Sequence, residues 1–233
     1  MKPISTLFSP LVHLFYPHNC EGCGNDILPG DNLLCLSCIN ELPHTFFASH
    51  PDNPVEKIFW GRLPVVAAMS EFYFRKGTLI QNLIHAFKYK GNKDMGKYLG
   101  RMMGESLLHC GRFQNIDLII PLPLFAAKEH KRGFNQAAIL CAGLSAKLKS
   151  NFANDCVIRK QFTETQTKKH RTERWQNVSG SFETINDQNL EGKHILLVDD
   201  VITTGATLEA CGNEILKVEG TKISVATLAF ASK

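Results

Sequence analysis

The fold of this 233-residue chain is decided by one stretch, which reads Leu196-Leu197-Val198-Asp199-Asp200-Val201-Ile202-Thr203-Thr204-Gly205-Ala206-Thr207. Together with the two residues before it, the run HILLV (194–198) predicts a short buried strand that ends at two acids. A helix is expected to begin after Gly205. A strand, a tight turn and a helix make up half of a βαβ unit, so the stretch predicts a parallel sheet with helices packed beside it.

Strand-like and helix-like patterns alternate through the chain from Leu63 onward. Strand patterns occupy residues 64–74, 116–120, 156–160 (weakly) and 223–230, and helical spacing of apolar residues occupies 79–87, 95–107 and 137–148. This alternation predicts an α/β fold with a mostly parallel central sheet flanked by helices. Ligands of such sheets bind at the carboxyl ends of the strands.

The turn after the HILLV strand has the composition of an anion site. Its backbone N–H groups, the start of the next helix, and the hydroxyls of Thr203, Thr204 and Thr207 can all donate to an anion. Gly205 allows the backbone to approach a phosphate closely. The turn therefore predicts a phosphate cradle.

Two acids next to such a cradle need a different partner, because Asp199 and Asp200 would repel a phosphate at close range. They suit a pair of vicinal hydroxyls with a divalent cation nearby, so the whole stretch suits a ribose 5-phosphate. A P-loop or a Rossmann site is disfavoured, since neither G-x-x-x-x-G-K-[ST] nor G-x-G-x-x-G occurs. A plain surface turn that caps a helix is the remaining alternative.

Four of the eight cysteines form two C-x-x-C pairs, Cys20/Cys23 and Cys35/Cys38. Two such knuckles predict a tetrahedral zinc site, and four sulfur ligands leave no position for a catalytic water, so the expected role of zinc is structural. A dithiol redox centre is the alternative. The other four cysteines stand singly in apolar surroundings, which is not the spacing of a disulfide scaffold and favours a reducing cytoplasm.

Composition excludes several classes of protein. With 44% hydrophobic and 21% charged residues the chain is neither disordered nor fibrous, and no stretch approaches the ~18 apolar residues of a membrane span. Residues 4–16 are interpreted as an amphipathic segment that packs on the protein rather than as a signal peptide. Residues 128–174 hold eleven Lys or Arg against four acids, a local charge of +7 within a net charge of +4.

The turn formers and cysteine pairs suggest three units: a zinc-ribbon segment (1–50), a loop-like linker (51–62) and a main domain (63–233). The stretch 196–207 resembles the phosphoribosyl-pyrophosphate (PRPP) signature of type I phosphoribosyltransferases. The whole chain resembles the ComF/GntX family, in which a zinc ribbon precedes such a domain. Besides the PRPP stretch, the resemblance rests on Cys20/Cys23/Cys35/Cys38, Lys88-Tyr89-Lys90-Gly91, Arg132-Gly133-Phe134-Asn135-Gln136, and the series Thr163, Gln166, Arg174 and Asn177.

The resemblance implies a type I phosphoribosyltransferase fold that binds PRPP with magnesium. The implied PRPP residues are Asp199, Asp200, Thr203, Thr204, Gly205, Ala206 and Thr207, of which the two acids would be catalytic. The implied pyrophosphate residues are Arg132, Gly133 and Lys88, whose alternative roles are those of a solvated basic loop or a surface lysine. Residues 161–181 would correspond to a flexible loop that closes over PRPP, with Gln166, Lys168 and Arg174 contributing to it.

Two functions are compatible with this resemblance. The first is phosphoribosyl transfer to an unidentified acceptor, linked to DNA uptake in natural competence. The second is a non-catalytic PRPP sensor that contacts single-stranded DNA or a competence helicase through its ribbon or its basic segment. A homodimer is a further expectation from the fold. Pyrophosphate release with a panel of acceptors would distinguish an enzyme from a sensor.

Overall fold

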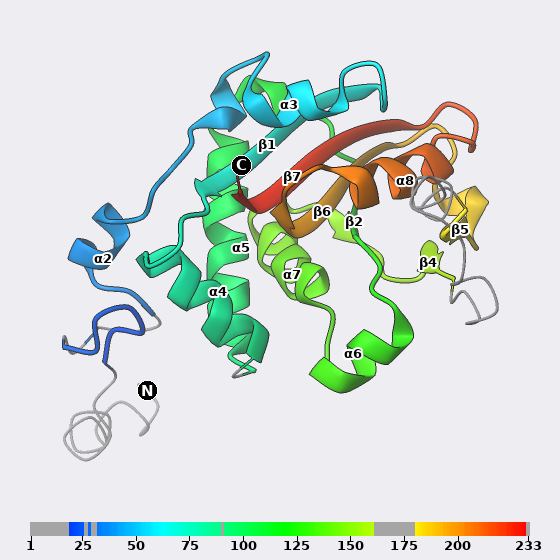
Figure 1. Cartoon of the computed structure of the whole chain (residues 1–233). Helices are drawn as coiled ribbons and strands as arrows, with labels where there is room; N and C mark the ends of the chain where they lie inside the picture. Colours follow the sequence, from blue (N-terminus) through cyan, green and yellow to red (C-terminus); the bar gives the residue numbers. More distant parts are fainter. Residues whose placement is uncertain (1–18, 26–27, 29–31, 90, 161–179, 232–233) are drawn as a thin grey trace, which may run out of the picture.

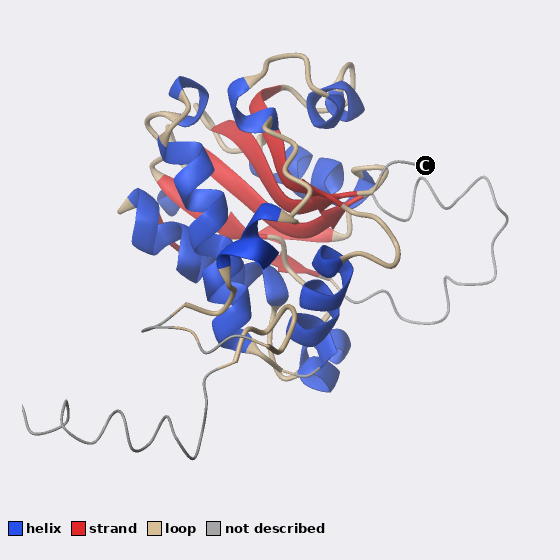
Figure 2. Ribbon diagram, turned by 90° about the vertical axis from the view of Figure 1, so that its left-hand side faces the viewer, coloured by secondary structure: helices blue, strands red, loops and turns tan. Residues whose placement is uncertain are grey.

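The computed structural model of the chain describes residues 19–25, 28, 32–89, 91–160 and 180–231 (Figure 1). Within these ranges a five-stranded parallel sheet lies between helices (Figure 2). Its strand order is β1-β7-β6-β2-β3. Its strands are β1 (Val65–Tyr73), β2 (Leu118–Pro121), β3 (Asn151–Phe152), β6 (His194–Ile202) and β7 (Lys222–Phe230). The predicted α/β class with a mostly parallel sheet is confirmed.

The central strands are buried on both faces, which explains their unbroken apolar sequences. In β6 the residues 195–198 have no exposed surface, and in β7 the residues 223–229 are buried. The HILLV prediction is confirmed, but β6 is longer than predicted. It continues through Asp199 and Asp200 to Ile202, because Val201 and Ile202 still pair with β7. The two acids therefore lie within the strand and not after it.

Two crossovers place helices on opposite faces of the sheet. The chain moves outward from β2 to β3 through two helices, and in the opposite direction from β6 to β7 through one. Right-handed crossovers in opposite directions put their helices on opposite faces. The helices of the main domain are α4 (Leu79–Tyr89), α5 (Lys93–Leu108), α6 (Ala126–Arg132), α7 (Gln136–Leu148) and α8 (Ala206–Ile215).

Helices α5 and α7 pack so closely that the backbone of each helix contacts the backbone of the other. A Cβ added at Gly100 of α5 would lie 2.3 Å from the carbonyl oxygen of Leu140, and one added at Gly143 of α7 would lie 2.2 Å from that of Lys97. Glycine at both crossing points lets the two helices form one layer on the sheet. This layer supports α4, whose last turn reaches the carboxyl edge of the sheet.

Residues 51–62, predicted as a loop-like linker, contain helix α3 (Pro54–Phe59), so the loop prediction is wrong for these six residues. Asn53 caps the helix, since its side-chain oxygen accepts from two N–H groups of the first turn, and Pro54 takes the first helical position. The buried Val55 and Phe59 pack this helix against the protein core. The short pattern of six residues offered too little periodicity to be read from sequence.

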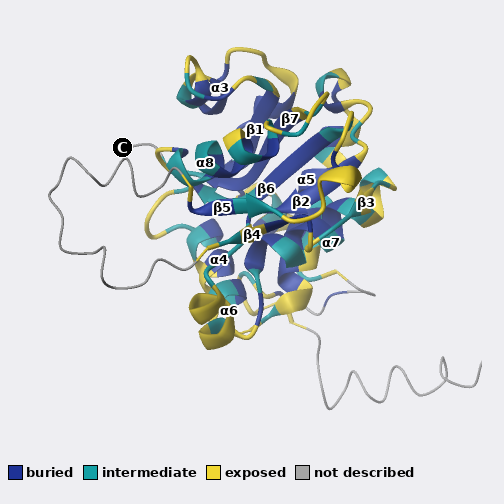
Figure 3. Cartoon of the chain, turned by 90° about the vertical axis from the view of Figure 1, so that its right-hand side faces the viewer, coloured by how far each residue is buried: buried dark blue, intermediate teal, exposed yellow. Residues whose placement is uncertain are grey.

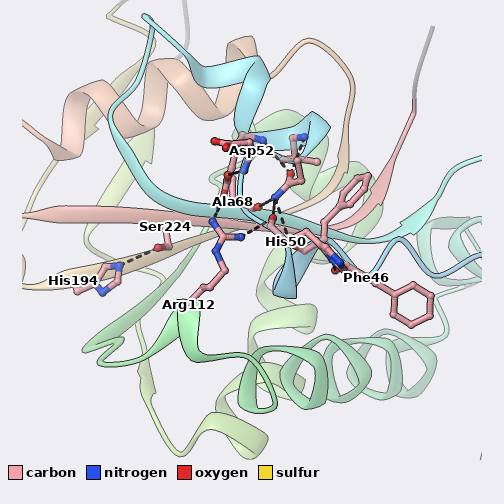
Figure 4. A network of polar contacts seen from close by, with 11 residues as sticks. Phe46, His50, Asp52, Ala68, Arg112, His194 and Ser224 are labelled. Carbon is pink, nitrogen blue, oxygen red and sulfur yellow. Dashed lines mark hydrogen bonds and ion pairs between the residues drawn. The ribbon is translucent and has the colours of Figure 1, made fainter.

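A polar network fixes α3 to β1 (Figure 4). The buried Glu56 accepts from the N–H groups of Asp52 at 2.7 Å and Ala68 at 3.1 Å. Its carboxylate also pairs with Arg112, which donates to the carbonyl oxygen of His50 at 2.9 Å. The chain before Leu63 is thereby joined to the main sheet by hydrogen bonds as well as by apolar contact.

The weak strand predicted at 156–160 is present as β4 (Val157–Arg159), but it lies outside the main sheet. It pairs antiparallel with β5 (Phe182–Thr184). The other short elements in the described ranges are α2 (Leu36–Asn40) and the 3-10 helices η1 (Phe47–Ser49), η2 (Gly111–Phe113) and η5 (Asp187–Asn189). Among the described residues, no helix has the length and apolarity that a membrane crossing requires. The predicted amphipathic segment 4–16 lies outside the described residues.

Candidate functional site

Asp199 and Asp200 lie near the carboxyl end of the central strand β6, each partly exposed beside fully buried residues. Successive side chains of a strand point to opposite faces, so the two acids are expected on opposite faces of β6. Asp200 reaches the face of α4, while Asp199 interacts electrostatically with Cys211 of α8. The backbone N–H of Asp200 donates to Oδ1 of Asp199 at 2.8 Å, which fixes the first carboxylate.

The Asp199 carboxyl holds a proton unusually strongly. Burial, reinforced by the neighbouring charge of Asp200, raises the pKa of Asp199 from 3.8 to about 8. The N–H of Asp200 and the cations Lys88 and Arg159 act in the opposite direction and reduce this shift. A carboxyl with a strongly raised pKa at the edge of a parallel sheet is typical of a functional site.

Lys88 is brought directly to this pair. It stands in the last turn of α4, whose Ile80, Leu83, Ile84 and Phe87 are buried against the core. Its Nζ lies 2.8 Å from Oδ2 of Asp200, and both side chains are mostly buried. The sequence left open whether Lys88 faces the site or solvent. The structure places it in the site, on a carboxylate.

The turn after β6 is exposed on one side, here called its front, and closely packed on the other side, its back. Thr203 and Thr204 are exposed, Gly205 is buried, and α8 begins directly at Ala206. Gly205 has φ +71°, and a Cβ there would lie 2.6 Å from Cγ2 of Ile58, so both backbone and space require glycine. No side chain of the described residues caps α8, so its first N–H groups remain available for an anion.

Arg132 and Gly133 lie at the end of α6, in the loop that follows β2. Helix α6 buries none of its residues (Figure 3), and Gly133 ends it with φ +79°. The Arg132 guanidinium donates to Oε1 of Gln136 at 2.7 Å and lies 5.8 Å from the ring centre of Tyr89. Because Tyr89 adjoins Lys88, these contacts bring Arg132 to the same end of α4 that pairs with Asp200.

Arg159 is a candidate site residue that the sequence reading missed. Its guanidinium lies 3.9 Å from the ring centre of Phe125 and 5.2 Å from that of Phe182, and its buried Nε has no hydrogen-bond partner among the described residues. Burial lowers the pKa of Arg159, and the Asp199 carboxylate partly offsets this effect. The only sequence signal was a position near the end of a weak strand, which does not reveal that Arg159 comes close enough to Asp199 to interact with it electrostatically.

The predicted flexible-loop residues Gln166, Lys168 and Arg174 lie outside the described residues, as do residues 161–179 as a whole. That segment connects β4 to β5 in the chain. The assignment of these three residues to PRPP therefore remains a prediction.

The four predicted zinc ligands form one cluster. The Sγ atoms of Cys20, Cys23, Cys35 and Cys38 all lie within 4.8 Å of one another, and three of the four residues are buried. Burial favours the thiol, but hydrogen bonds from backbone N–H groups outweigh it and lower the pKa of Cys20 to about 6. Four converging thiols, one of them acidic, fit a structural zinc ion and leave no open ligand position.

Comparison with known proteins agrees with this architecture. Residues 130–233 match the phosphoribosyl transferase domain, a range that includes Asp199, Asp200 and the turn after them. The chain is 29% identical to the DNA utilization protein YhgH of Shigella flexneri over 195 residues (80% of this chain and 79% of the relative), and 27% identical to Competence protein F of Haemophilus influenzae over 233 residues (93% and 99%). The chain is thus similar to ComF/YhgH proteins over most of its length.

The matched phosphoribosyl transferase domain implies PRPP binding, and the four-cysteine cluster is consistent with a structural zinc ion. Among solved structures, the glutamine PRPP amidotransferase of Bacillus subtilis aligns with a TM-score of 0.40 and 17% identity, covering 57% of this chain and 25% of that one.

Proposed function

We propose that this protein binds PRPP with magnesium and transfers its phosphoribosyl group to an acceptor. The observation that carries the proposal is the convergence at one sheet edge of two partly buried carboxylates, a turn with free N–H groups, and cations from three other elements. These cations are Lys88 of α4, Arg132 of α6 and Arg159 of β4. An anionic sugar ligand needs both kinds of partner, since its diol is recognised by carboxylates and its phosphates by cations and N–H groups.

Each group has a defined task in this proposal. The N–H groups of Thr203 to Thr207 and the threonine hydroxyls hold the 5′-phosphate, and Asp199 and Asp200 hold the ribose. Carboxylate oxygens are also suitable ligands for magnesium, which would neutralise charge on the pyrophosphate when bound. Arg132, Lys88 and Arg159 lie where they can hold that pyrophosphate, and Lys88 is released for it when Asp200 turns to the sugar.

The transfer itself requires no nucleophile from the protein. The bond from C1 of the ribose to the pyrophosphate oxygen breaks, and its electron pair leaves with the pyrophosphate. A lone pair of the acceptor then forms the new bond to C1, and the acceptor loses a proton. The carboxylate of Asp200 stabilises the positive charge that develops on the sugar, Asp199 contributes in its ionised form, and the cations stabilise the leaving group.

The cysteine cluster has a separate role in the proposal. Zinc held by Cys20, Cys23, Cys35 and Cys38 would fix the fold of the N-terminal segment, because no ligand position remains for substrate. Metal analysis of the purified protein should find one zinc per chain, and the Cys20→Ser/Cys38→Ser double variant should lose it.

A role in DNA handling is proposed from the printed names of the relatives, a DNA utilization protein and a competence protein. The exposed Lys128 and Lys131 on α6 support contact with a polyanion such as single-stranded DNA. A PRPP sensor that acts on a DNA-bound partner is the second candidate function, favoured by the same basic surface.

Calorimetric titration with PRPP and magnesium tests the binding step. Wild type should bind, and the Asp199→Asn/Asp200→Asn double variant should bind at least a hundredfold more weakly. Equal binding by both proteins would refute the assignment of the acids. An acceptor screen with pyrophosphate release as the readout then separates the candidates, since release with an acceptor supports transfer and binding without release supports a sensor.

A further inference from the structure

The turn after β6 rests on a segment that lies far away in sequence, the end of α3 and the residues that follow it. Arg62 makes three polar contacts there. Its Nη1 donates to the carbonyl oxygens of Thr204 and Ile58, each at 3.2 Å. Its Nη2 pairs with the carboxylate of Glu209, in the first turn of α8. Arg62 thereby ties α3, the turn and the helix together.

Apolar contacts join the same segments that Arg62 connects. Gly205 faces Ile58 so closely that a Cβ would clash, as described above. Further along α8, a Cβ added at Gly212 would lie 2.7 Å from Cδ2 of Leu63. Residues 58–63 therefore form the back of the turn and of the start of α8, although the sequence suggested a linker here.

The contact to Thr204 determines where one donor of the turn points. The Thr204 carbonyl and the Gly205 N–H belong to the same planar trans peptide, in which C=O and N–H point in opposite directions. Since Arg62 holds the carbonyl toward the back, the N–H of Gly205 points away from Arg62, to the open front. A rotated peptide would present a carbonyl oxygen to an anion instead of a donor.

We propose that Arg62 is a positioning residue for the 5′-phosphate of the sugar ligand. By holding the Thr204–Gly205 peptide, it keeps the turn in the conformation that donates to phosphate. This inference rests on the proposed function, and it adds a prediction about which of two ligands depends on Arg62. Arg62 should affect ligands that carry the 5′-phosphate and leave pyrophosphate binding unchanged, because pyrophosphate is assigned to other residues.

The chain offers a matched control. Arg112 also anchors α3 through an acid, Glu56, and also donates to a backbone carbonyl, that of His50 (Figure 4). Its side chain is 22% exposed, close to the 30% of Arg62. It has no hydrogen bond or ion pair to residues of the turn within the described chain. A loss of stability through α3 should therefore be common to both arginines, and a loss of phosphate binding should be specific to Arg62.

The test measures binding of ribose 5-phosphate and of magnesium pyrophosphate to the full chain by calorimetry, with thermal melting as a fold check. Arg62→Ala should weaken ribose 5-phosphate about tenfold, the equivalent of one hydrogen bond to a charged group, and leave pyrophosphate within about twofold. Arg62→Lys should lie between wild type and Arg62→Ala, because an ammonium cannot bond two carbonyls and a carboxylate in the same plane. Arg112→Ala should bind both ligands like wild type.

Unchanged ribose 5-phosphate binding by a folded Arg62→Ala would overturn the proposal. So would an equal loss for both ligands, or the same loss in Arg112→Ala, because either result indicates a general effect on the fold. Should Arg62→Ala not fold, Glu209→Gln removes one charge of the tie and should weaken ribose 5-phosphate about threefold. Failure of the wild type to bind ribose 5-phosphate or PRPP would refute the proposed function itself, and is distinguishable from these results.

Discussion

The two loops at the carboxyl edge of the sheet, after β6 and after β2, both turn on a glycine with positive φ. Gly205 has φ +71° and Gly133 has φ +79°. A Cβ at Gly205 would clash with Ile58, whereas a Cβ at Gly133 would have nothing within 4 Å. The turn at Gly205 is therefore shaped by packing from behind, whereas among the described residues no side chain or backbone packs behind the turn at Gly133. A glycine with positive φ thus belongs to a preorganised loop after β6 and to an exposed loop after β2.

The largest effect is expected from Gly205→Ala. The variant combines an unfavourable backbone conformation with a clash against α3, so it should lower the free energy of unfolding by about 2–4 kcal/mol. Because the turn must shift, binding of ribose 5-phosphate should weaken about thirtyfold or more. Chemical denaturation and calorimetry measure both quantities. Wild-type affinity in this variant would show that the back of the turn does not shape its front.

The partly buried Asp199 should make the loop after β6 sensitive to pH. The native state holds the proton of Asp199 up to about pH 8, whereas the unfolded chain releases it near 3.8, so its contribution to stability falls as the pH rises between these values. The Asp199→Asn variant has no titrating carboxyl at this position, so it lacks this pH-dependent contribution to stability. Relative to wild type, the variant should gain about 4 kcal/mol of stability between pH 5 and pH 8.

Thermal melts of both proteins across that pH range test this prediction. Asp200, Lys88 and Arg159 remain in the variant, so a difference in pH dependence between the two proteins reports the titration of the acidic pair. Parallel melting curves for the two proteins at all pH values would contradict the raised pKa.

Arg132→Ala tests the loop after β2. Loss of a charged donor should weaken magnesium pyrophosphate about tenfold, while the free energy of unfolding changes by less than about 0.5 kcal/mol because α6 buries nothing. Lys128→Ala, on the same exposed helix, serves as the control and should change pyrophosphate affinity less than about twofold. A similar loss in both variants would indicate general electrostatic attraction rather than a site at Arg132.

The smallest effect is expected from Gly133→Ala, the counterpart of the first substitution. Only the positive φ is unfavourable here, so the cost to stability should be about 1 kcal/mol. Ribose 5-phosphate affinity should not change. If Gly133→Ala and Gly205→Ala had equal effects, the difference in packing behind the two loops would have no energetic consequence.

Much of the site was predictable because its signals are local. The spacing of the cysteine pairs brings their thiols together within a few turns of chain, and the order of acids, threonines and glycine after β6 follows one strand into one helix. Helix α3 was not predictable, since six residues carry little periodicity. Arg159 was missed for a different reason, because its strand pairs outside the main sheet.

The sequence by itself determined which chemical groups this protein brings to a ligand: four thiols, two carboxylates and a donor-rich turn. Only the tertiary structure decided which distant cations meet them, namely Lys88 on Asp200, Arg159 near Asp199, and Arg62 behind Thr204. The physical reason is that a turn or a metal knuckle closes within its own short segment. The meeting of side chains from separate elements depends instead on sheet order, crossover direction and helix packing, which no local pattern records.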